Sequence, residues 1–341
     1  MIRDVLERLL AGESLPPETM EECFGTLMGG EWAEGEQAAF LVALRAKGES
    51  ASEVAAAARV LRRFAVPVPT RRAPLVDTCG TGGDSAHTLN ISTGAALVAA
   101  ACGVAVAKHG NRSVSSRCGS ADVLEALGVP LDLEADQLGT LLDDEGFAFL
   151  FAPRLHPAMR AVMPVRRALG VRTVFNILGP LANPAGVSRQ VVGVYSAALQ
   201  QLVAGALAEL GAEHVWVVHG DDGLDEISVC APTRVVEVRD GRIAGEFVIA
   251  PEKLGLKRAV QAELAGGDAS ENAARLRAIL SGQERSGARD AVALNAAAAL
   301  IVAGRTADLS EALAQASECL DRGLPAKTLD AVVRRAKELR P

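Results

Sequence analysis

The sequence predicts an α/β protein with a small, all-helical N-terminal domain and a larger α/β domain built on a mostly parallel central sheet. Residues 1–65 show helical periodicity only. Three prolines then fall within nine residues, which indicates an extended linker. Beyond the linker, short apolar runs alternate with helical patterns, as expected of a parallel sheet covered by helices. We therefore place a helical domain at 1–66, a linker at 67–73 and an α/β domain at 74–341.

Four helices are expected in the N-terminal domain. The first is indicated by apolar residues at the spacing of one helical face, namely Ile2, Val5, Leu6, Leu9 and Leu10. The second has prolines in its first turn, where they are well tolerated, and ends at Gly29–Gly30. The third is expected at 36–46. The fourth begins with the capping box Ser50–Glu53 and runs to about residue 64.

Strands and helices alternate after the linker. The runs expected to form parallel strands are 75–76, 104–107, 147–151, 191–195 and 215–218. Helices are expected to begin near Thr93 and Ala121 and to cover 199–210. Asp240–Gly241 separates two further apolar runs and is typical of the turn of a β-hairpin. The C-terminal third is predicted to be mostly helical.

The composition disfavours nucleic-acid binding and metal sites built from cysteine. The chain has 35 basic and 42 acidic residues, for a net charge of −7, and only 2 Trp, 1 Tyr and 8 Phe. Sequence-independent binding of nucleic acid needs positive charge and stacking surfaces, so no nucleic-acid partner is expected. The six cysteines form no C-x-x-C pair, which disfavours a zinc site or a redox motif.

The sequence also gives no sign of secretion or membrane insertion. Acidic residues lie among the apolar ones at the N-terminus, unlike in a signal peptide. The longest uncharged stretch, 190–208, contains polar residues and is interpreted as a strand followed by a helix. We therefore expect a soluble, cytoplasmic protein with reduced thiols and no membrane partner.

A Gly-rich segment, Asp77–Asp84, follows the first predicted strand and reads Asp-Thr-Cys-Gly-Thr-Gly-Gly-Asp. Glycines let the backbone approach a ligand closely, and successive N–H groups can hold an anion. No Gly-Lys-Ser/Thr follows, so this is not a Walker A loop, and Ser85 replaces the third glycine of a dinucleotide-binding G-x-G-x-x-G. A tight turn without a ligand is the alternative.

Two further loops carry groups that suit anions. Asn90–Gly94 precedes a long apolar helix, and a helix N-terminus attracts anions; capping alone would need only one of its polar side chains. Lys108 ends the next strand, at the edge where open α/β sheets bind ligands, and is a candidate to neutralise phosphate. His109 lies between Lys108 and Asn111, which favours substrate contact over a packing role, although we do not assign it as a base.

An acidic loop follows the strand at 215–218. It contains Asp221, Asp222, Asp225 and Glu226. Carboxylates supply the hard oxygen ligands that Mg²⁺ prefers, and acids this close repel one another unless a cation or solvent intervenes. A solvated turn is the alternative, favoured for Asp221 and Asp222. Neighbouring strand residues point to opposite faces, so Asp225 and Glu226 need a turn to share one ion, or they serve two.

A basic segment, residues 156–180, stands out in this acidic chain. Its basic side chains include Arg160, Arg166, Arg167 and Arg172. Arginine suits bidentate recognition of a carboxylate, whereas a surface salt bridge is the alternative for any single one of them. Two phosphate-cradling loops, a predicted Mg²⁺ site and these arginines together indicate a Mg²⁺-dependent enzyme acting on a phosphorylated small molecule.

Six motifs follow one another along nearly the whole chain: Gly80–Asp84, Asn90–Thr93, Lys108–Asn111, Gly119–Glu125, Arg172–Asn176 and Asp225–Glu226. In this order they resemble the anthranilate phosphoribosyltransferase family. The resemblance implies a nucleoside phosphorylase-like fold, with helices around 160–185 joined to the helical domain and a substrate cleft between the domains. It implies transfer of phosphoribose from phosphoribosyl pyrophosphate to anthranilate, in tryptophan biosynthesis, by a homodimer that associates through its helical domains.

The resemblance also implies the site residues. Phosphoribosyl pyrophosphate would be bound by Gly80, Thr81, Gly82, Gly83, Asp84, Thr88, Asn90, Ser92, Thr93, Lys108, Ser116 and Ser120. Anthranilate would be contacted by Gly80, His109, Asn111 and Arg166, the last through the substrate's carboxylate. Ser92 would touch one Mg²⁺, and Asp225 with Glu226 a second, giving two ions per monomer. No residue is implied as a catalytic base, and which loop holds which phosphate stays open.

Two other functions remain as alternatives. A pyrimidine-nucleoside phosphorylase shares the fold but uses inorganic phosphate and a nucleoside, whereas Lys108–Asn111 and Arg166 resemble the transferase. A non-catalytic, nucleic-acid-binding relative is disfavoured by the intact Gly80–Asp84 and Asp225–Glu226 motifs and by the net charge of −7.

Overall fold

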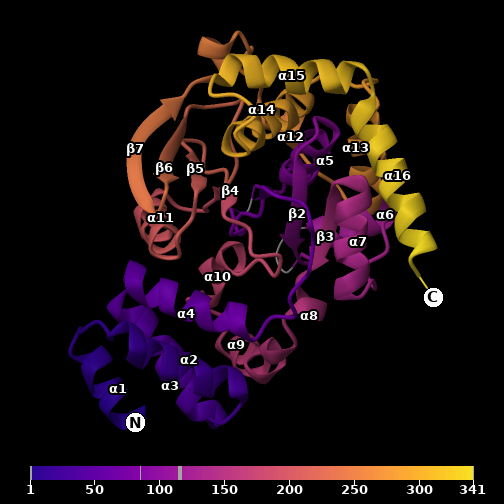
Figure 1. Ribbon diagram of the computed structural model, residues 1–341. Coiled ribbons are helices and arrows are strands. Elements are labelled where there is room, and N and C mark those ends of the chain that lie inside the picture. The colour runs from indigo at the N-terminus through magenta and orange to yellow at the C-terminus, as the bar shows by residue number, and fades with distance from the viewer. Residues whose placement is uncertain (1, 85, 114–116, 341) are drawn as a thin grey trace.

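The computed structural model describes residues 2–84, 86–113 and 117–340. The lower lobe in Figure 1 contains the four predicted N-terminal helices, which are α1 (Ile2–Leu10), α2 (Pro17–Gly29), α3 (Glu34–Lys47) and α4 (Ala51–Arg63). The predicted capping box opens α4: Glu53 N–H donates to Ser50 Oγ at 3.2 Å, and Ser50 N–H donates to Glu53 Oε2 at 2.8 Å. The buried Glu53 carboxylate also pairs with Lys47 at 2.7 Å, so its charge is compensated.

The upper lobe is built on one seven-stranded sheet, ordered β3-β2-β1-β4-β5-β6-β7. Its first five strands are parallel: β1 (Leu75–Asp77), β2 (Ala105–Gly110), β3 (Phe147–Phe151), β4 (Arg189–Gly193) and β5 (His214–Gly220). The last two, β6 (Thr233–Arg239) and β7 (Arg242–Ile249), form the predicted hairpin and pair antiparallel. At its turn Asp240 and Gly241 both have positive φ, +46° and +71°, as such two-residue turns require.

Helices cover both faces of this sheet. The helices that alternate with the strands along the chain are α5 (Ile91–Ala101), α6 (Ser120–Ala126), α7 (Ala135–Glu145) and α11 (Gln200–Glu209). The C-terminal third is helical as predicted, with α12 (Gln261–Leu264), α13 (Ala269–Leu280), α14 (Gly287–Val302), α15 (Leu309–Asp321) and α16 (Leu324–Glu338). Three short helices, α8 (Ala152–Leu155), α9 (Met163–Leu169) and α10 (Phe175–Leu178), lie where the two lobes meet (Figure 1).

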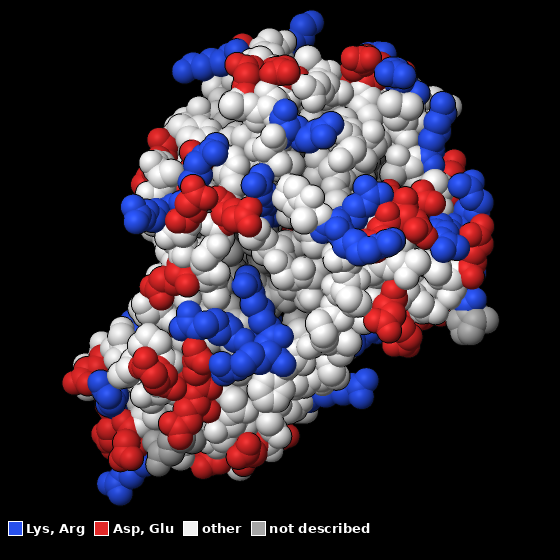
Figure 2. Space-filling view, in the orientation of Figure 1, with Lys and Arg blue, Asp and Glu red and all other residues white. Residues whose placement is uncertain are grey.

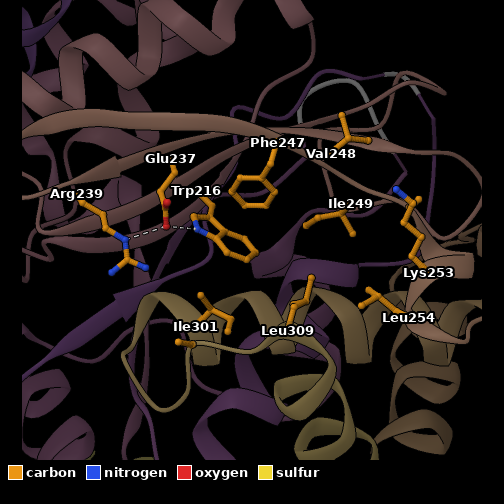
Figure 3. Close-up of a pocket in the computed structure, with 12 residues that line it drawn as sticks. Trp216, Glu237, Arg239, Phe247, Val248, Ile249, Lys253, Leu254, Ile301 and Leu309 are labelled. Carbon is orange, nitrogen blue, oxygen red and sulfur yellow. Dashed lines mark hydrogen bonds and ion pairs between the residues drawn. The ribbon is translucent and has the colours of Figure 1, made fainter.

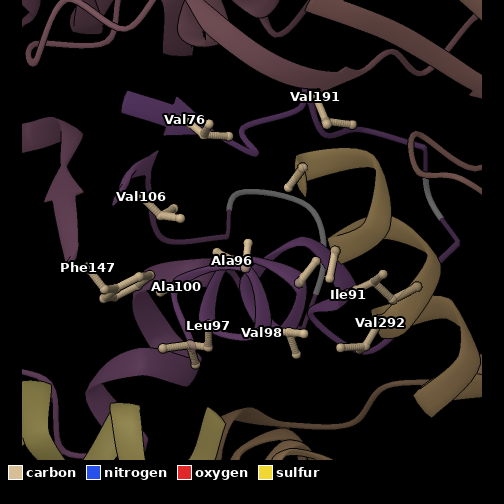
Figure 4. Packing of buried hydrophobic residues seen from close by; sticks show 14 of the residues in the cluster. Val76, Ile91, Ala96, Leu97, Val98, Ala100, Val106, Phe147, Val191 and Val292 are labelled. Carbon is tan, nitrogen blue, oxygen red and sulfur yellow. The ribbon is translucent and has the colours of Figure 1, made fainter. Parts of the chain in front are cut away.

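Two hydrophobic cores hold the molecule together. In the first, the apolar helix α5 packs between the sheet and α14, with Val76, Val106 and Phe147 of the strands on one side and Val292 on the other (Figure 4). A Cβ at Gly94 would lie 2.8 Å from Leu276 Cδ1 and 3.0 Å from a methyl carbon of Val292, so glycine permits this close helix packing.

The second core continues from the helical lobe into the sheet. It joins buried residues of α1–α4 to those of α9, α10 and α11 and to one face of β4, β5 and β6. The predicted linker is irregular but packed, because Val68 is buried and its N–H donates to the Pro184 carbonyl at 3.2 Å. Among the described residues, no helix combines the length and apolar character needed to cross a bilayer.

Candidate functional site

The candidate site lies at the carboxyl ends of the parallel strands, where the chain order of the sheet reverses. From β1 the chain continues outward through β2 and β3, whereas β4 and β5 extend on the other side of β1. The helices that follow β1 and β4 belong to different cores, α5 to the first and α11 to the second. Open α/β sheets bind ligands in the crevice at such a switch point.

The Gly-rich loop spans this crevice. Thr81 N–H donates to the Gly193 carbonyl at the end of β4, at 2.8 Å, and its Oγ1 accepts from Tyr195 N–H at 3.2 Å. A Cβ at Gly80 would lie 3.0 Å from the Gly193 carbonyl oxygen and 3.3 Å from Asp225 Oδ2, so only glycine fits without a shift. Gly82 and Gly83 have φ of +66° and +86°. The loop is therefore close to β4 and to the acidic loop.

Three carboxyl groups meet beside this loop. Asp225 and Glu226 lie in the bend that the acidic loop needs if both are to face one site. Burial raises the pKa of Asp225 well above its ordinary value, and the charges of Glu226 and Asp84 raise it further. Burial also raises the pKa of Glu226, although Lys108 opposes this. A cation would relieve this repulsion, although among the described residues the three carboxyl groups are not grouped to hold a metal by themselves.

The other two acids of the loop, for which a solvated turn was the favoured alternative, each pair with a side chain nearby. Asp221 pairs with Arg234 across the start of the hairpin, with 2.9 Å between Oδ1 and Nε. Asp222 accepts a hydrogen bond from Ser228 Oγ at 2.6 Å. Neither side chain contributes to the carboxyl cluster.

The N-terminus of α5 brings Ser92 to the carboxyl cluster. Glu226 Oε1 accepts from Ser92 N–H at 3.2 Å. Although Asn90 is the N-cap residue, its side chain makes no capping bond; it donates to the Cys118 carbonyl and accepts from Asn272. The carboxylate of a distant loop thus satisfies an amide of this helix end.

Three other predicted phosphate-binding residues differ in their surroundings. Thr93 is buried, and its Oγ1 has no hydrogen-bond partner among the described residues. Thr88 forms an isolated antiparallel bridge with Ala265. Lys108 is 2% exposed, and its Nζ donates to the carbonyl and Oγ1 of Thr78, each at 3.1 Å. In this structure Lys108 therefore acts from beneath the Gly-rich loop, where its charge opposes the rise in the pKa of Glu226.

The predicted anthranilate contacts His109 and Asn111 lie at the C-terminal end of β2 and directly after it. His109 is buried, and its Nδ1 lies 3.1 Å from the Gly179 carbonyl oxygen. Burial and the nearby His156 lower the pKa of His109 to about 3, so its ring is neutral at pH 7. Asn111 is exposed, and its carbonyl accepts from Ser120 Oγ at 3.3 Å. Ser116, also predicted to bind phosphoribosyl pyrophosphate, lies outside the described residues.

Arg166 projects from α9 as a guanidinium that has no carboxylate partner in the described part of the chain. It lies over the Phe175 ring, 5.0 Å from the centroid, and donates to Met163 Sδ at 3.8 Å. Burial lowers its pKa. In Figure 2, basic side chains gather over the region of α9 and α10, beside the notch between the lobes. An arginine without a counter-ion here suits an anionic ligand.

The sequence analysis assigned no individual site role to His156, Arg172 or Tyr195, although Arg172 opens one of the six motifs. His156 stacks on His109 with 5.1 Å between ring centroids, and burial lowers its pKa to about 4. Arg172 donates to the Gly83 carbonyl at 2.7 Å and lies over the Tyr195 ring. His156 and Arg172 both belong to the basic segment, so that segment was the available signal. Nothing in the local sequence marked Tyr195.

A separate cavity of about 380 Å³ lies between β7 and the start of α15. Figure 3 shows Phe247, Leu254 and Leu309 around it, with Glu237 bonded to Trp216 and Arg239 at one end. None of the predicted site residues lines this cavity. It is therefore distinct from the candidate site.

Comparisons with known proteins agree with this geometry. A family model described as "Glycosyl transferase family, a/b domain" matches residues 72–326, and its helical bundle counterpart matches residues 3–65. The anthranilate phosphoribosyltransferase of Moorella thermoacetica is 50% identical over 333 residues, which cover 98% of each chain. The crystal structure of the Thermus thermophilus enzyme of that name is 48% identical, with a TM-score of 0.93 over 98% of this chain and 99% of that one.

The chain belongs to the anthranilate phosphoribosyltransferase family. The predicted fold class, family and glycosyltransferase activity class are confirmed by these matches. The family member from Saccharomyces cerevisiae, solved in complex with PRPP and Mg, is 27% identical, with a TM-score of 0.91 over 99% of this chain and 98% of that one. The roles of individual site residues and the exact domain boundaries stay predictions.

Proposed function

We propose that this chain transfers the phosphoribosyl group of 5-phosphoribosyl 1-pyrophosphate to the amine of anthranilate, giving N-(5-phosphoribosyl)anthranilate and pyrophosphate in tryptophan biosynthesis. One observation carries the proposal: the Gly-rich loop, the N-terminus of α5 and the carboxyl pair Asp225–Glu226 meet at the switch point of the sheet. The names of the family members support it, and the yeast enzyme has been solved with PRPP and with 4-fluoroanthranilate.

The site suits a reaction driven by charge and position. Breaking the bond between ribose C1 and pyrophosphate places positive charge on the sugar, as in other glycosyl transfers. The backbone N–H groups of the Gly-rich loop then stabilise the growing negative charge of the leaving group. The amine of anthranilate is already a neutral nucleophile at pH 7, so no strong base is needed. The low pKa of His109, about 3, agrees with this, because a ring with so low a pKa is a weak base.

The carboxyl cluster suits Mg²⁺, and we propose that two ions bind per monomer. Asp225 and Glu226 would hold one and Ser92 would touch the other; when bound, Mg²⁺ supplies positive charge that stabilises the departing pyrophosphate. Among the described residues no three His, Cys, Asp or Glu side chains are grouped to hold a metal by themselves. Mg²⁺ is commonly bound by one or two carboxylates together with substrate phosphates. Binding of metal and of phosphoribosyl pyrophosphate should therefore depend on each other.

The oligomeric state and the compartment are also proposals. The homodimer through the helical lobe stays a proposal; in this lobe the apolar side chains of Leu10 and Val42 are exposed, at 74% and 44%. A cytoplasmic location is supported by the six cysteines, none of which forms a disulfide within the described ranges.

The reaction is tested by the loss of anthranilate fluorescence in a mixture from which each component is omitted in turn. The full mixture should react, whereas omission of phosphoribosyl pyrophosphate or of Mg²⁺, or addition of excess chelator, should stop the loss. A parallel mixture of inorganic phosphate and a pyrimidine nucleoside tests the phosphorylase alternative and should show no base release. Full activity in excess chelator would contradict the Mg²⁺ proposal.

The backbone cradle can be tested at Gly82 and Gly83. Because both have positive φ and their N–H groups are proposed to face the pyrophosphate, Gly82→Ala or Gly83→Ala should raise the Kd for phosphoribosyl pyrophosphate. The free energy of unfolding should fall by only about 1–2 kcal/mol, the strain of one non-glycine residue in this region. Calorimetric titration and thermal melts of each variant measure the two effects.

Gly186 provides the matched control. It has φ of +67° and no atom within 4 Å of an added Cβ, so Gly186→Ala carries similar strain away from the loop. This variant should lose similar stability and keep its affinity for phosphoribosyl pyrophosphate. Unchanged affinity in both loop variants would mean that the glycines form only a turn.

A further inference from the structure

Arg172 joins the Gly-rich loop to two segments that are distant in sequence. Its Nη2 donates to the Gly83 carbonyl at 2.7 Å, and its guanidinium carbon lies 3.8 Å from the centroid of the Tyr195 ring. A Cβ placed on Gly83 would lie 3.5 Å from the same Nη2 and 3.9 Å from Tyr195 Cδ1. The loop therefore packs directly against a stacked arginine–tyrosine pair.

The two partners reach the loop from different sides. Tyr195 follows β4, and the same stretch of chain holds Thr81 through the Gly193 carbonyl and the Tyr195 N–H. Arg172 comes from the basic segment: α9 carries Arg166 and ends at Leu169, and the capping residue Gly170 has φ of +61° and turns the chain. The loop is thus fixed at Thr81 from the sheet and at Gly83 from the segment that carries Arg166.

The hydrogen bond to Gly83 acts at the point where the loop has most conformational freedom. Gly82 and Gly83 both have positive φ, a region that glycine enters and leaves easily. The Gly83 carbonyl accepts from the charged guanidinium of Arg172, whose plane is stacked on the Tyr195 ring. A hydrogen bond from such a donor is stronger and more directional than one between neutral groups. Fixing this carbonyl fixes the orientation of the peptide group between residues 83 and 84.

We propose that Arg172, stacked on Tyr195, is a positioning residue that holds the Gly-rich loop in the conformation that binds phosphoribosyl pyrophosphate. It acts through the loop backbone and does not take part in the chemistry. The inference rests on the proposed role of Gly80–Asp84 in binding that substrate. Without Arg172, the loop would have to become ordered when phosphoribosyl pyrophosphate binds. The loss of Arg172 should therefore lower mainly the affinity for this one substrate.

The test compares Arg172→Gln, Arg172→Lys and the control Arg167→Gln, an exposed arginine on α9 of the same segment. Arg172→Gln should raise the KM for phosphoribosyl pyrophosphate about tenfold, which is the effect expected from losing one hydrogen bond from a charged donor. The KM for anthranilate and the melting temperature should change little, because Arg172 is exposed. Arg172→Lys should recover part of the loss, since lysine can donate to the carbonyl but lacks the planar stack. Arg167→Gln should match the unsubstituted enzyme.

A double-mutant cycle with Tyr195→Leu tests whether the pair acts as a unit. Tyr195→Leu alone should raise the same KM, and it should add little in the Arg172→Gln background. The proposal is overturned if Arg172→Gln leaves this KM unchanged, or if it lowers only kcat, raises both KM values equally, or adds fully to Tyr195→Leu. If the unsubstituted enzyme shows no reaction that requires phosphoribosyl pyrophosphate, the proposed function fails instead.

Discussion

Replacing Asp225 and Glu226 together, as Asp225→Asn with Glu226→Gln, is expected to lower kcat/KM by at least about 10²-fold while the protein stays folded. Neutral amides cannot supply the anionic oxygens that Mg²⁺ needs, so the leaving group loses several kcal/mol of charge stabilisation, at about 1.4 kcal/mol per tenfold in rate. The fluorescence assay at saturating Mg²⁺ measures this loss.

The same double variant should be at least as stable as the unsubstituted protein when no metal is present. Burial and the charges of neighbouring acids raise the pKa of both carboxyl groups, which means that folding disfavours their charged forms. The free-energy cost of burying the two charged carboxylates is absent at low pH, where both groups are protonated in the folded and unfolded states. Because the pKa is raised in the folded state, this cost grows as the pH rises through the pKa values of the unfolded state. Amides remove it, so the melting temperature at pH 7 without metal should stay level or rise.

Two further measurements complete this prediction. Phosphoribosyl pyrophosphate with Mg²⁺ should raise the melting temperature of the unsubstituted protein and should fail to do so for the double variant. Asp221→Asn is the matched control, since Asp221 lies in the same loop but pairs with Arg234, and it should keep full activity. Retained activity in the double variant, or a fall in its metal-free stability, would show that the carboxyl pair is structural.

The fold was predictable because its signals are local. The apolar spacing of α1, the capping box of α4, the short apolar strands and the Asp240–Gly241 turn each depend on residues close together in sequence. The proposed chemistry of the loops rests on equally local signals. Runs of glycine, hydroxyl or carboxylate side chains directly after strands indicate what a loop can bind before its neighbours are known.

What the sequence did not predict depends on contacts between distant segments. The cap of α5 comes from Glu226, not from Asn90, because the acidic loop lies over this helix end. Lys108 bonds to Thr78 beneath the Gly-rich loop, since β1 and β2 are neighbours in the sheet. The contact between Arg172 and Tyr195 requires that the basic segment cross the end of β4. In each pair the two partners are far apart in sequence, so local pattern carries no sign of them.

Arg166→Ala is expected to raise the KM for anthranilate about tenfold to a hundredfold and to leave the KM for phosphoribosyl pyrophosphate nearly unchanged. The expected size is that of a charge-assisted pair, about 1.5–3 kcal/mol. The melting temperature should change little, because the variant removes a partly buried guanidinium that has no carboxylate partner in the described chain and whose pKa is lowered by burial. Arg166→Lys should be intermediate, since lysine keeps the charge but not the bidentate fork.

A neutral analogue of the substrate separates carboxylate recognition from a structural role of Arg166. The carboxamide of anthranilate should react with the unsubstituted enzyme about as poorly as anthranilate reacts with Arg166→Ala. The Arg166→Ala variant should then scarcely distinguish the two compounds, because the group that senses the negative charge is gone. If Arg166→Ala still prefers anthranilate over its carboxamide by the full original factor, another residue binds the carboxylate, and the contact of Arg166 with Phe175 serves packing alone.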